Sequence, residues 1–198
     1  MSDKILGAVA VLVLAVSVIP DLATAQTPER QKAVLITGAT SGIGRLATEK
    51  LASEGYYVYA GARKDSDIEA LNRIENVTAV RLDVTRQEEI DAAVRFVESE
   101  GRGLWGLVNN AGINIIDPLI EADESDLRFL FDVNVFGVFR VTSAFAPQII
   151  ESGGRIVNIS SISGVLAGSL TSYGMYSMSK HAVEAYTDQL ASEMASLG

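Results

Sequence analysis

The sequence contains no cysteine, so its 198 residues form no disulfide bond, which is compatible with an oxidising compartment but does not require one. It also has no basic run or stripe, and its formal net charge is −9. This charge argues against nucleic acid as a partner. We see no internal repeat or low-complexity tract, and we expect no metal site. With 48% hydrophobic residues, the chain is long enough for one sizeable core, so we expect a single domain.

An apolar N-terminal segment precedes this domain. Residues 5–19 are apolar or small, Lys4 lies before them, and an Ala-Thr-Ala sequence at 23–25 forms a small-x-small cleavage site. We therefore predict a secretory signal peptide at 1–25, followed by a linker at 26–31. On this interpretation the protein is periplasmic or secreted.

An uncleaved membrane anchor is the alternative interpretation of the same segment. The apolar run is short for a membrane span. If it is retained, Arg30 and Lys32 favour a cytoplasmic location for the domain that follows, because positive charges beside a span stay inside. The membrane is a partner only in this case.

From residue 32 to 198, apolar strand patterns alternate with helical patterns. Strands that carry few charges and alternate with helices form a parallel sheet covered on both faces, and right-handed crossovers make it doubly wound. The predicted fold class is α/β, a doubly wound, Rossmann-like parallel sheet in a single domain at 32–198. Ligands of such sheets bind beyond the carboxyl ends of the strands. The predicted strands are 33–37, 57–60, 78–82, 106–109 and 155–160, and the predicted helices are 43–54, 67–73, 87–99, 124–150 and 176–196.

A glycine-rich segment joins the first predicted strand to the first predicted helix, with the sequence TGATSGIG from Thr37 to Gly44. Gly38 allows a tight turn, Gly42 lets the backbone approach a pyrophosphate, and Gly44 permits close helix packing. Free N–H groups at the helix start attract the anion. Because the spacing differs from the commoner G-x-G-x-x-G, an ordinary strand-to-helix turn is the alternative.

A tyrosine and a lysine lie four residues apart in the last predicted helix. Residues at the spacing of Tyr176 and Lys180 are neighbours on one helical face. An ammonium this close stabilises the phenolate over the phenol, which makes the tyrosine a usable acid or base near neutrality. Such pairs also occur by chance on solvated helices, so a surface contact is the alternative.

Five motifs together resemble those of the short-chain dehydrogenase/reductase family, and they occur in the family's order along residues 32–198. Their joint occurrence by chance is far rarer than that of any one motif, so the resemblance is specific. It implies a dinucleotide-dependent oxidoreductase that interconverts a secondary alcohol and a ketone. The motifs are Thr37-Gly38-x-x-x-Gly42-Ile43-Gly44, Asn109-Asn110-Ala111-Gly112, Asn134 in Asp132-Val133-Asn134-Val135, Ser160-Ser161, and Tyr176-x-x-x-Lys180.

The resemblance implies catalytic roles for four residues. Tyr176 protonates the substrate oxygen in reduction or accepts its proton in oxidation, while the nicotinamide carries the hydride. Lys180 promotes ionisation of this tyrosine and binds the nicotinamide ribose. Ser161 holds the substrate carbonyl, and Asn134 positions a water for proton relay through Lys180. The alternatives are a strand-end turn residue for Ser161 and satisfaction of backbone groups inside a helix for Asn134.

Two serines compete for the substrate-binding role. The serine-to-tyrosine spacing of many family members would select Ser163, whereas alignment on the strand 155–159 selects Ser161. We prefer the strand alignment, because a strand end fixes the position of a side chain and the following loop can absorb extra residues. Tyr173 has no lysine four residues on, so we expect it to form at most part of the pocket wall.

The resemblance also implies which residues bind the cofactor. NAD-dependent members carry an acidic residue after the second strand, but this sequence has Ala62 at that position. The following Arg63 could pair with a 2′-phosphate. We therefore expect NADP as the cofactor, with NAD as the alternative. A solvated loop is the other interpretation of Arg63. Asp83 corresponds to the adenine contact, or else caps the helix before Gln87. The expected cofactor-binding residues are Gly38, Thr40, Ser41, Gly42, Ile43, Gly44, Arg63, Asp83, Val84, Asn110, Ala111, Gly112, Tyr176 and Lys180.

The family continues after the tyrosine helix with further strands and a substrate-binding loop, whereas this sequence stops at Gly198. We therefore expect a C-terminally truncated sequence that lacks the last strands of the family fold and leaves the strand 155–160 at a sheet edge. The predicted function is an NADP-dependent oxidoreductase acting on a small apolar carbonyl or alcohol, homo-oligomeric when full length. The alternative is a non-catalytic dinucleotide-binding fragment that cannot close a substrate pocket.

Overall fold

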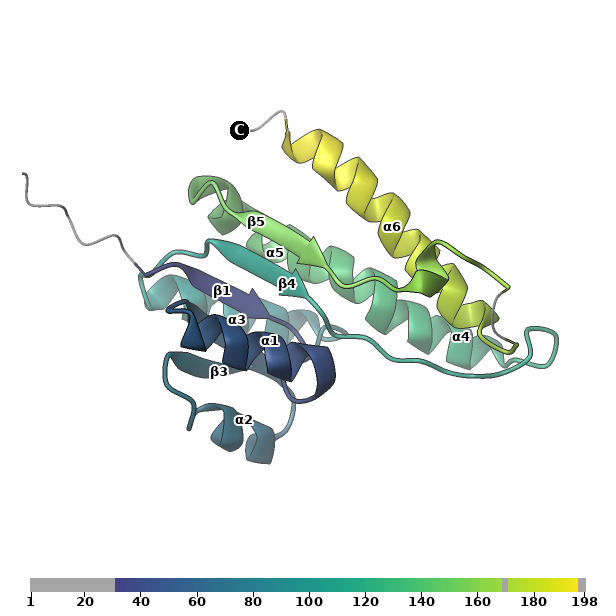
Figure 1. The fold of residues 1–198 in the computed structure, drawn as a ribbon, viewed down its shortest axis with the longest axis horizontal. Helices are drawn as coiled ribbons and strands as arrows, with labels where there is room; N and C mark the ends of the chain where they lie inside the picture. The colour runs from purple at the N-terminus through teal and green to yellow at the C-terminus, as the bar shows by residue number, and fades with distance from the viewer. Residues whose placement is uncertain (1–30, 169–170, 196–198) are drawn as a thin grey trace, which may run out of the picture.

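The structure is a computed structural model that describes residues 31–168 and 171–195 (Figure 1). The expected signal peptide or anchor at 1–25 and all of the expected linker except Gln31 lie outside the described residues. The domain is a five-stranded parallel sheet with helices on both faces, as predicted. The strands are β1 (Ala33–Ile36), β2 (Tyr57–Ala62), β3 (Val77–Arg81), β4 (Gly106–Asn109) and β5 (Arg155–Asn158). The helices are α1 (Gly42–Ser53), α2 (Asp65–Leu71), α3 (Gln87–Ser99), α4 (Glu124–Phe131), α5 (Gly137–Glu151) and α6 (Gly174–Met194).

The predicted elements are all present, and the differences are local. The helix predicted at 124–150 is continuous from Glu124 to Glu151, but a π-helical turn, η1 (Asp132–Phe136), changes its backbone hydrogen bonding between α4 and α5. The pattern starts the second helix at 67, whereas α2 begins at Asp65, because an acidic side chain is favourable in the first turn, where the helix dipole is positive. A short 3-10 turn, η2 (Ile162–Gly164), follows β5 and has no signal in the apolar pattern.

The strand order is β3-β2-β1-β4-β5, with β1 at the centre and buried along its whole length. Successive strand residues face opposite sides of the sheet, so neighbours such as Val34 and Leu35 belong to different cores. Helices α1 and α2 cover the core around Val34, whereas α3 and α5 cover the core around Leu35. The chain extends from β1 through β2 to β3 and then returns to the other side of β1. This reversal is the place where sheets of this class bind ligands.

Strand β5 lies at an edge of the sheet, as predicted. Among the described residues its one strand neighbour is β4, and its residue Val157 is 49% exposed. An edge of this kind presents unpaired backbone groups that can accept a further strand.

The continuous helix Glu124–Glu151 passes a test of length and composition for a membrane span, and it is the one helix that does so within the described part of the chain. It spans α4, η1 and α5 and has a mean hydropathy of 1.4 in its most apolar window, of which 44% is buried inside the domain. Helix α5 packs on the sheet through residues such as Phe145. Burial of this kind is what the core helix of a sheet layer requires, so the test is weak evidence for a membrane span.

Candidate active site

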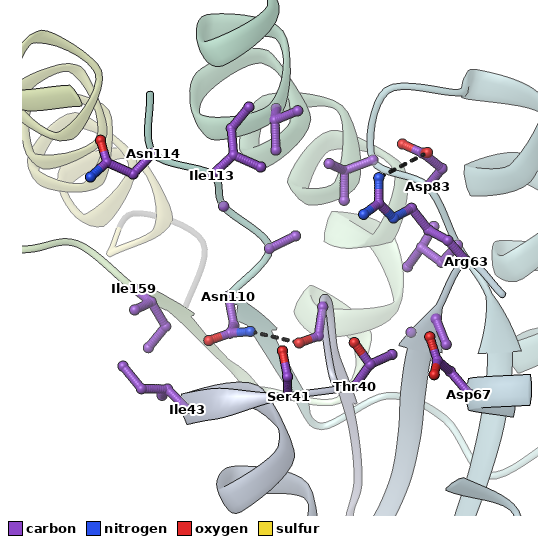
Figure 2. A pocket seen from close by; sticks show the side chains of 18 of the residues that line it. Thr40, Ser41, Ile43, Arg63, Asp67, Asp83, Asn110, Ile113, Asn114 and Ile159 are labelled. Atoms are coloured by element: carbon purple, nitrogen blue, oxygen red, sulfur yellow. Dashed lines mark hydrogen bonds and ion pairs between the residues drawn. The ribbon is translucent and has the colours of Figure 1, made fainter. Parts of the chain in front are cut away.

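A cavity of about 480 Å³ opens at the carboxyl ends of the strands, close to the reversal between β1 and β4 (Figure 2). Its size is typical of small-molecule pockets. Segments that follow all five strands contribute to it, together with α6. The expected site residues that line it are Gly38, Thr40, Ser41, Ile43, Arg63, Asp83, Val84, Asn110, Ala111, Gly112, Tyr176 and Lys180. The expected site residues outside this lining are Gly42, Gly44, Asn134 and Ser161.

The turn after β1 is tied to the segment after β4. Thr37 Oγ1 accepts hydrogen bonds from the backbone N–H groups of Asn110 and Ala111, both at 3.0 Å. Nδ2 of Asn110 donates to the carbonyl oxygens of Thr37 and Gly38, again at 3.0 Å. Gly38 has a φ of +63°, and a Cβ there would lie 2.9 Å from Cα of Ala111. Glycine at position 38 therefore serves both a left-handed turn and a close backbone approach.

Helix α1 begins at the cavity, which Ser41 and Ile43 line. Its N-cap, Ser41, makes no side-chain capping hydrogen bond. Gly42 has a φ of +53°, and no atom of the described residues lies within 4 Å of the place its Cβ would take. Open space beside an uncapped helix start suits a pyrophosphate, because the N–H groups and the helix dipole both favour an anion. The residues present therefore fit a dinucleotide.

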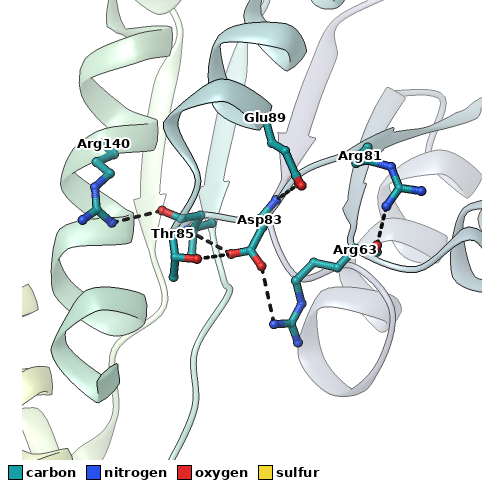
Figure 3. Close-up of polar contacts among 7 residues, drawn as sticks. Arg63, Arg81, Asp83, Thr85, Glu89 and Arg140 are labelled. Carbon is teal, nitrogen blue, oxygen red and sulfur yellow. Dashed lines mark hydrogen bonds and ion pairs between the residues drawn. The ribbon is translucent and has the colours of Figure 1, made fainter. Parts of the chain in front are cut away.

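Asp83 lies just beyond the end of β3 and is held in a fixed orientation (Figure 3). Its Oδ1 accepts hydrogen bonds from the N–H of Thr85 at 2.9 Å and from Oγ1 of Thr85 at 2.7 Å. Burial opposes ionisation, but these hydrogen bonds and the charge of Arg63 outweigh it and hold the pKa of Asp83 below its usual value. The alternative role as cap of α3 is wrong, because Arg86 takes the N-cap position.

Arg63 follows β2 and extends toward Asp83 (Figure 3). Its Nη1 lies 3.8 Å from Oδ2 of Asp83, and its side chain is 64% exposed. The carbonyl oxygen of Arg63 accepts a hydrogen bond of 2.6 Å from Nη1 of Arg81, which also pairs with Asp65. The backbone of Arg63 is thus anchored while its guanidinium stays accessible to a ligand.

Tyr176 and Lys180 both line the cavity from α6, so the pair faces the site rather than solvent alone. Nζ of Lys180 lies 5.7 Å from the centre of the Tyr176 ring. Lys180 is 5% exposed, and its Nζ donates a 2.8 Å hydrogen bond to the carbonyl oxygen of Ile159. Burial lowers the pKa of Lys180, and the negative charge of Glu184 opposes this shift. The ammonium is therefore fixed beside the phenol.

Asn134 lies in η1, where a π-helical turn often marks a functional position. Its Oδ1 accepts a 2.8 Å hydrogen bond from the N–H of Ile113, and its Nδ2 donates to the carbonyl oxygen of Ile113 at 2.9 Å and to Oγ of Ser179 at 3.1 Å. A Cβ on Gly112 would lie 3.4 Å from Oδ1 of Asn134 and 3.8 Å from Nζ of Lys180. The amide therefore satisfies backbone groups next to the site, but those of a neighbouring segment and not of its own helix.

Three serines after β5 occupy different environments. Ser160 lines the cavity, and its buried Oγ has no hydrogen-bond partner among the described residues. Ser161 is the N-cap of η2, where its Oγ accepts a 3.1 Å hydrogen bond from the N–H of Ser163. Ser163 itself is 4% exposed. The hydroxyl proton of Ser161 is not used in this capping bond, so it stays available to a carbonyl oxygen.

Some lining residues have no clear signal in the sequence. Ile113 and Ile159 act through backbone groups, which every residue has, so no side-chain pattern marks them. Asp67 and Asn114 line the cavity because of where α2 and the segment after β4 lie. An acidic residue soon after Arg63 is visible in the sequence, but the fold decides that it faces the site.

Comparison with known proteins identifies the family of this chain. A family model described as short chain dehydrogenase matches residues 32–198. A 3-amino-tetrahydro-pyrrolizinone reductase of Xenorhabdus hominickii is 39% identical over 170 residues, which cover 85% of this chain and 58% of the relative. The 17-beta-hydroxysteroid dehydrogenase type 6 of Homo sapiens is 40% identical over 177 residues, which cover 85% of this chain and 54% of the relative. The chain thus spans little more than half the length of these relatives.

Solved structures of short-chain dehydrogenases and related dehydrogenases also match this chain. A short-chain dehydrogenase from Streptomyces avermitilis matches with a TM-score of 0.80 and 38% identity, over 86% of this chain and 63% of that one. A gluconate 5-dehydrogenase from Burkholderia cenocepacia J2315 was solved in complex with NADP and tartrate. It matches with a TM-score of 0.79 and 30% identity, over 84% of this chain and 67% of that one. The family match covers the whole of the described domain, and the chain therefore belongs to the short-chain dehydrogenase family.

Proposed function

We propose that this chain carries the catalytic site of an NADP-dependent oxidoreductase that interconverts a secondary alcohol and a ketone. The observation that carries the proposal is the convergence of Tyr176 and Lys180 with the glycine turn after β1 on one cavity. Hydride exchange with a carbonyl needs a bound dinucleotide and a proton donor at the same place. The names of the relatives, which are dehydrogenases and reductases, agree with this chemistry.

In this mechanism the dinucleotide supplies or accepts the hydride at the substrate carbon. Tyr176 donates its phenolic proton to the carbonyl oxygen in reduction and takes a proton back in oxidation. Lys180 stabilises the phenolate that remains, because its ammonium lies close to the ring and is shielded from water. The free hydroxyl proton of Ser161 orients the carbonyl oxygen.

Lys180 has further donors for the cofactor and for a proton path. An ammonium carries three N–H groups, and the hydrogen bond to Ile159 uses one of them. We assign the remaining two to the nicotinamide ribose and to a relay water. Asn134 joins the segment after β4 to α6 next to this lysine, since its amide bonds to Ile113 and to Ser179, which precedes Lys180 in the helix.

The proposed preference for NADP rests on the end of β2. Ala62 offers no carboxylate for the ribose hydroxyls, and the cations Arg63 and Lys64 line the cavity directly after it. A phosphate group pairs well with an accessible guanidinium. The gluconate 5-dehydrogenase mentioned above was solved with NADP, and so was ElxO, which matches with a TM-score of 0.79 and 30% identity.

Replacing Arg63 with alanine is expected to weaken NADPH binding about tenfold and to leave NADH binding nearly unchanged. A charge-assisted hydrogen bond contributes about 1.5–3 kcal/mol, and exposure of the guanidinium reduces this to the lower end. Fluorescence titration of both cofactors measures the effect. Arg73→Ala is the matched control, because Arg73 is exposed and lies outside the cavity lining. Equal affinity of the unaltered protein for the two cofactors, or an unchanged preference in Arg63→Ala, would contradict the assignment.

We propose an apolar substrate because two segments that contact α6 carry exposed apolar side chains. The segment after β4 reaches the start of α6, where the N–H of Asp117 donates a 3.1 Å hydrogen bond to the carbonyl oxygen of Ser172. The turn η2 and the residues that directly follow it form the second segment, and η2 packs on α6. The exposed apolar residues of these two segments are Ile116, Leu119, Ile120, Ile162, Val165 and Leu166.

The experiment that tests the proposed function is NADPH oxidation in the presence of a panel of apolar and polar ketones, with identification of the alcohol formed. Turnover of apolar ketones supports the proposal. Cofactor binding without turnover of any ketone would favour the second candidate, a non-catalytic dinucleotide-binding fragment. Both candidates bind the cofactor in the same cavity, so turnover distinguishes them.

For the N-terminal segment we propose export followed by cleavage after Ala25. The expected result is a mature protein in the periplasm or medium that begins at Gln26, because the small-x-small site at 23–25 directly precedes it. N-terminal sequencing of fractionated protein checks this. An intact N-terminus in the membrane fraction would show the anchor instead.

A further inference from the structure

Four charged residues line the part of the cavity beyond the ends of β2 and β3, where the adenosine of the proposed dinucleotide would bind. We call this part the adenosine end, and its four charges cancel. Two are the cations Arg63 and Lys64, and two are the carboxylates Asp67 and Asp83. A 2′-phosphate adds about −1.5 to −2 charges relative to the ribose hydroxyl of NAD. A site with no net positive charge therefore has little long-range attraction for this group. The preference for NADP then depends on where the individual charges lie.

Arg63 is already partly neutralised. Its Nη1 lies 3.8 Å from Oδ2 of Asp83 (Figure 3), and hydrogen bonds from Thr85 keep this carboxylate ionised and in place. The guanidinium must act on a phosphate from within this pairing. Its effect on a 2′-phosphate is smaller than that of an isolated arginine, because the neighbouring negative charge repels the phosphate.

Asp67 is the carboxylate at this end that has no compensating ion pair within the described part of the chain. It lies in the first turn of α2, is half-buried, and is placed beside Thr40 on the side of the cavity from which Arg63 enters (Figure 2). Its helix neighbour Asp65 differs, because that residue pairs with Arg81 and does not line the cavity.

We propose that Asp67 determines how strongly this site discriminates between the two cofactors. This inference rests on the proposed dinucleotide function. The carboxylate repels a 2′-phosphate, whereas it does not repel the uncharged ribose hydroxyl of NAD(H), from which it can accept a hydrogen bond. Asp67 therefore weakens NADP(H) binding and does not weaken NAD(H) binding. The enzyme accordingly uses both cofactors, with a modest preference for NADP(H) that Arg63 and Lys64 provide.

The test is the affinity of Asp67→Asn for NADPH and NADH, measured by fluorescence titration at low and at high salt. NADPH is expected to bind about fivefold more tightly at low salt, with a smaller gain at high salt, because the removed repulsion is screened. NADH affinity is expected to stay within about twofold, since its 2′-hydroxyl is uncharged and the asparagine amide oxygen can also accept a hydrogen bond from it. Asp67→Glu keeps the charge and is expected to keep the original preference.

Glu69→Gln is the matched control, because Glu69 lies on the same helix, is exposed and lies outside the cavity lining. It removes the same charge and is expected to change neither affinity. The inference is overturned if Asp67→Asn tightens NADPH and NADH equally or leaves both unchanged, or if Glu69→Gln has the same effect. If these results overturn the role of Asp67 but every variant still binds NADH tightly, the proposed dinucleotide function is supported. Failure of every variant to bind either cofactor would overturn both proposals.

Discussion

Replacing Tyr176 with phenylalanine is expected to reduce turnover about 10²–10⁴-fold, the usual contribution of a positioned general acid or base. The change removes only the phenolic hydroxyl, so the ring keeps its place between Lys180 and Tyr173, with which it makes an edge-to-face contact at 6.4 Å. Cofactor affinity should stay within about threefold, because the glycine turn and the adenosine end are untouched. Steady-state rates and cofactor titration on the same preparation separate the two effects.

Two further variants sharpen this test. Tyr173→Phe is the matched control, because Tyr173 is adjacent, aromatic and without a lysine one helical turn ahead; we expect near-normal turnover. Lys180→Ala should impair both turnover and cofactor binding, since the ammonium serves both. If Tyr176→Phe kept its activity within about tenfold of the parent, equivalent to roughly 1.4 kcal/mol of transition-state stabilisation, another group would be the acid.

Replacing Gly44 with alanine is expected to destabilise the domain by about 3 kcal/mol and to abolish dinucleotide binding. A Cβ at this position would overlap the carbonyl oxygen of Gly38 and Nδ2 of Asn110, at separations far below any real Cβ contact. Backbone atoms cannot move aside as a flexible side chain does. The glycine turn must therefore open, and the hydrogen bonds from Asn110 are lost with it. Denaturant unfolding and cofactor titration measure the two losses.

Gly42→Asn gives the contrasting outcome and is the control for this prediction. Gly42 has a left-handed backbone conformation that asparagine tolerates, and its Cβ direction is open. We expect a loss of no more than about 1–2 kcal/mol of stability, but weak cofactor binding, because the new side chain fills the place proposed for the pyrophosphate. Equal stability losses for the two variants would show that Gly44 is not a packing position.

The sequence by itself determined the order of the elements and the places of the motifs along the chain. Apolar runs such as 33–36 are explained by burial on both faces of a parallel strand, and the amphipathic helix at 87–99 forms with the predicted bounds. The glycines after β1 could be assigned because only glycine takes a left-handed turn at close backbone approach without strain. Signals of this kind are local, so they can be read along the chain.

The tertiary structure decided everything that depends on packing between distant segments. The π-helical turn that presents Asn134 forms where α4 and α5 pack on the rest of the domain, and the amide then binds the backbone of Ile113. Burial of Lys180 against Ile159, the place of Ser160 in the cavity wall, and the Asp83 turn closed by Thr85 likewise have no sequence pattern. The charge balance of the adenosine end arises only when α2 brings Asp67 beside the cavity. Through-space contacts and electrostatic fields depend on distance, and the sequence alone does not contain these distances.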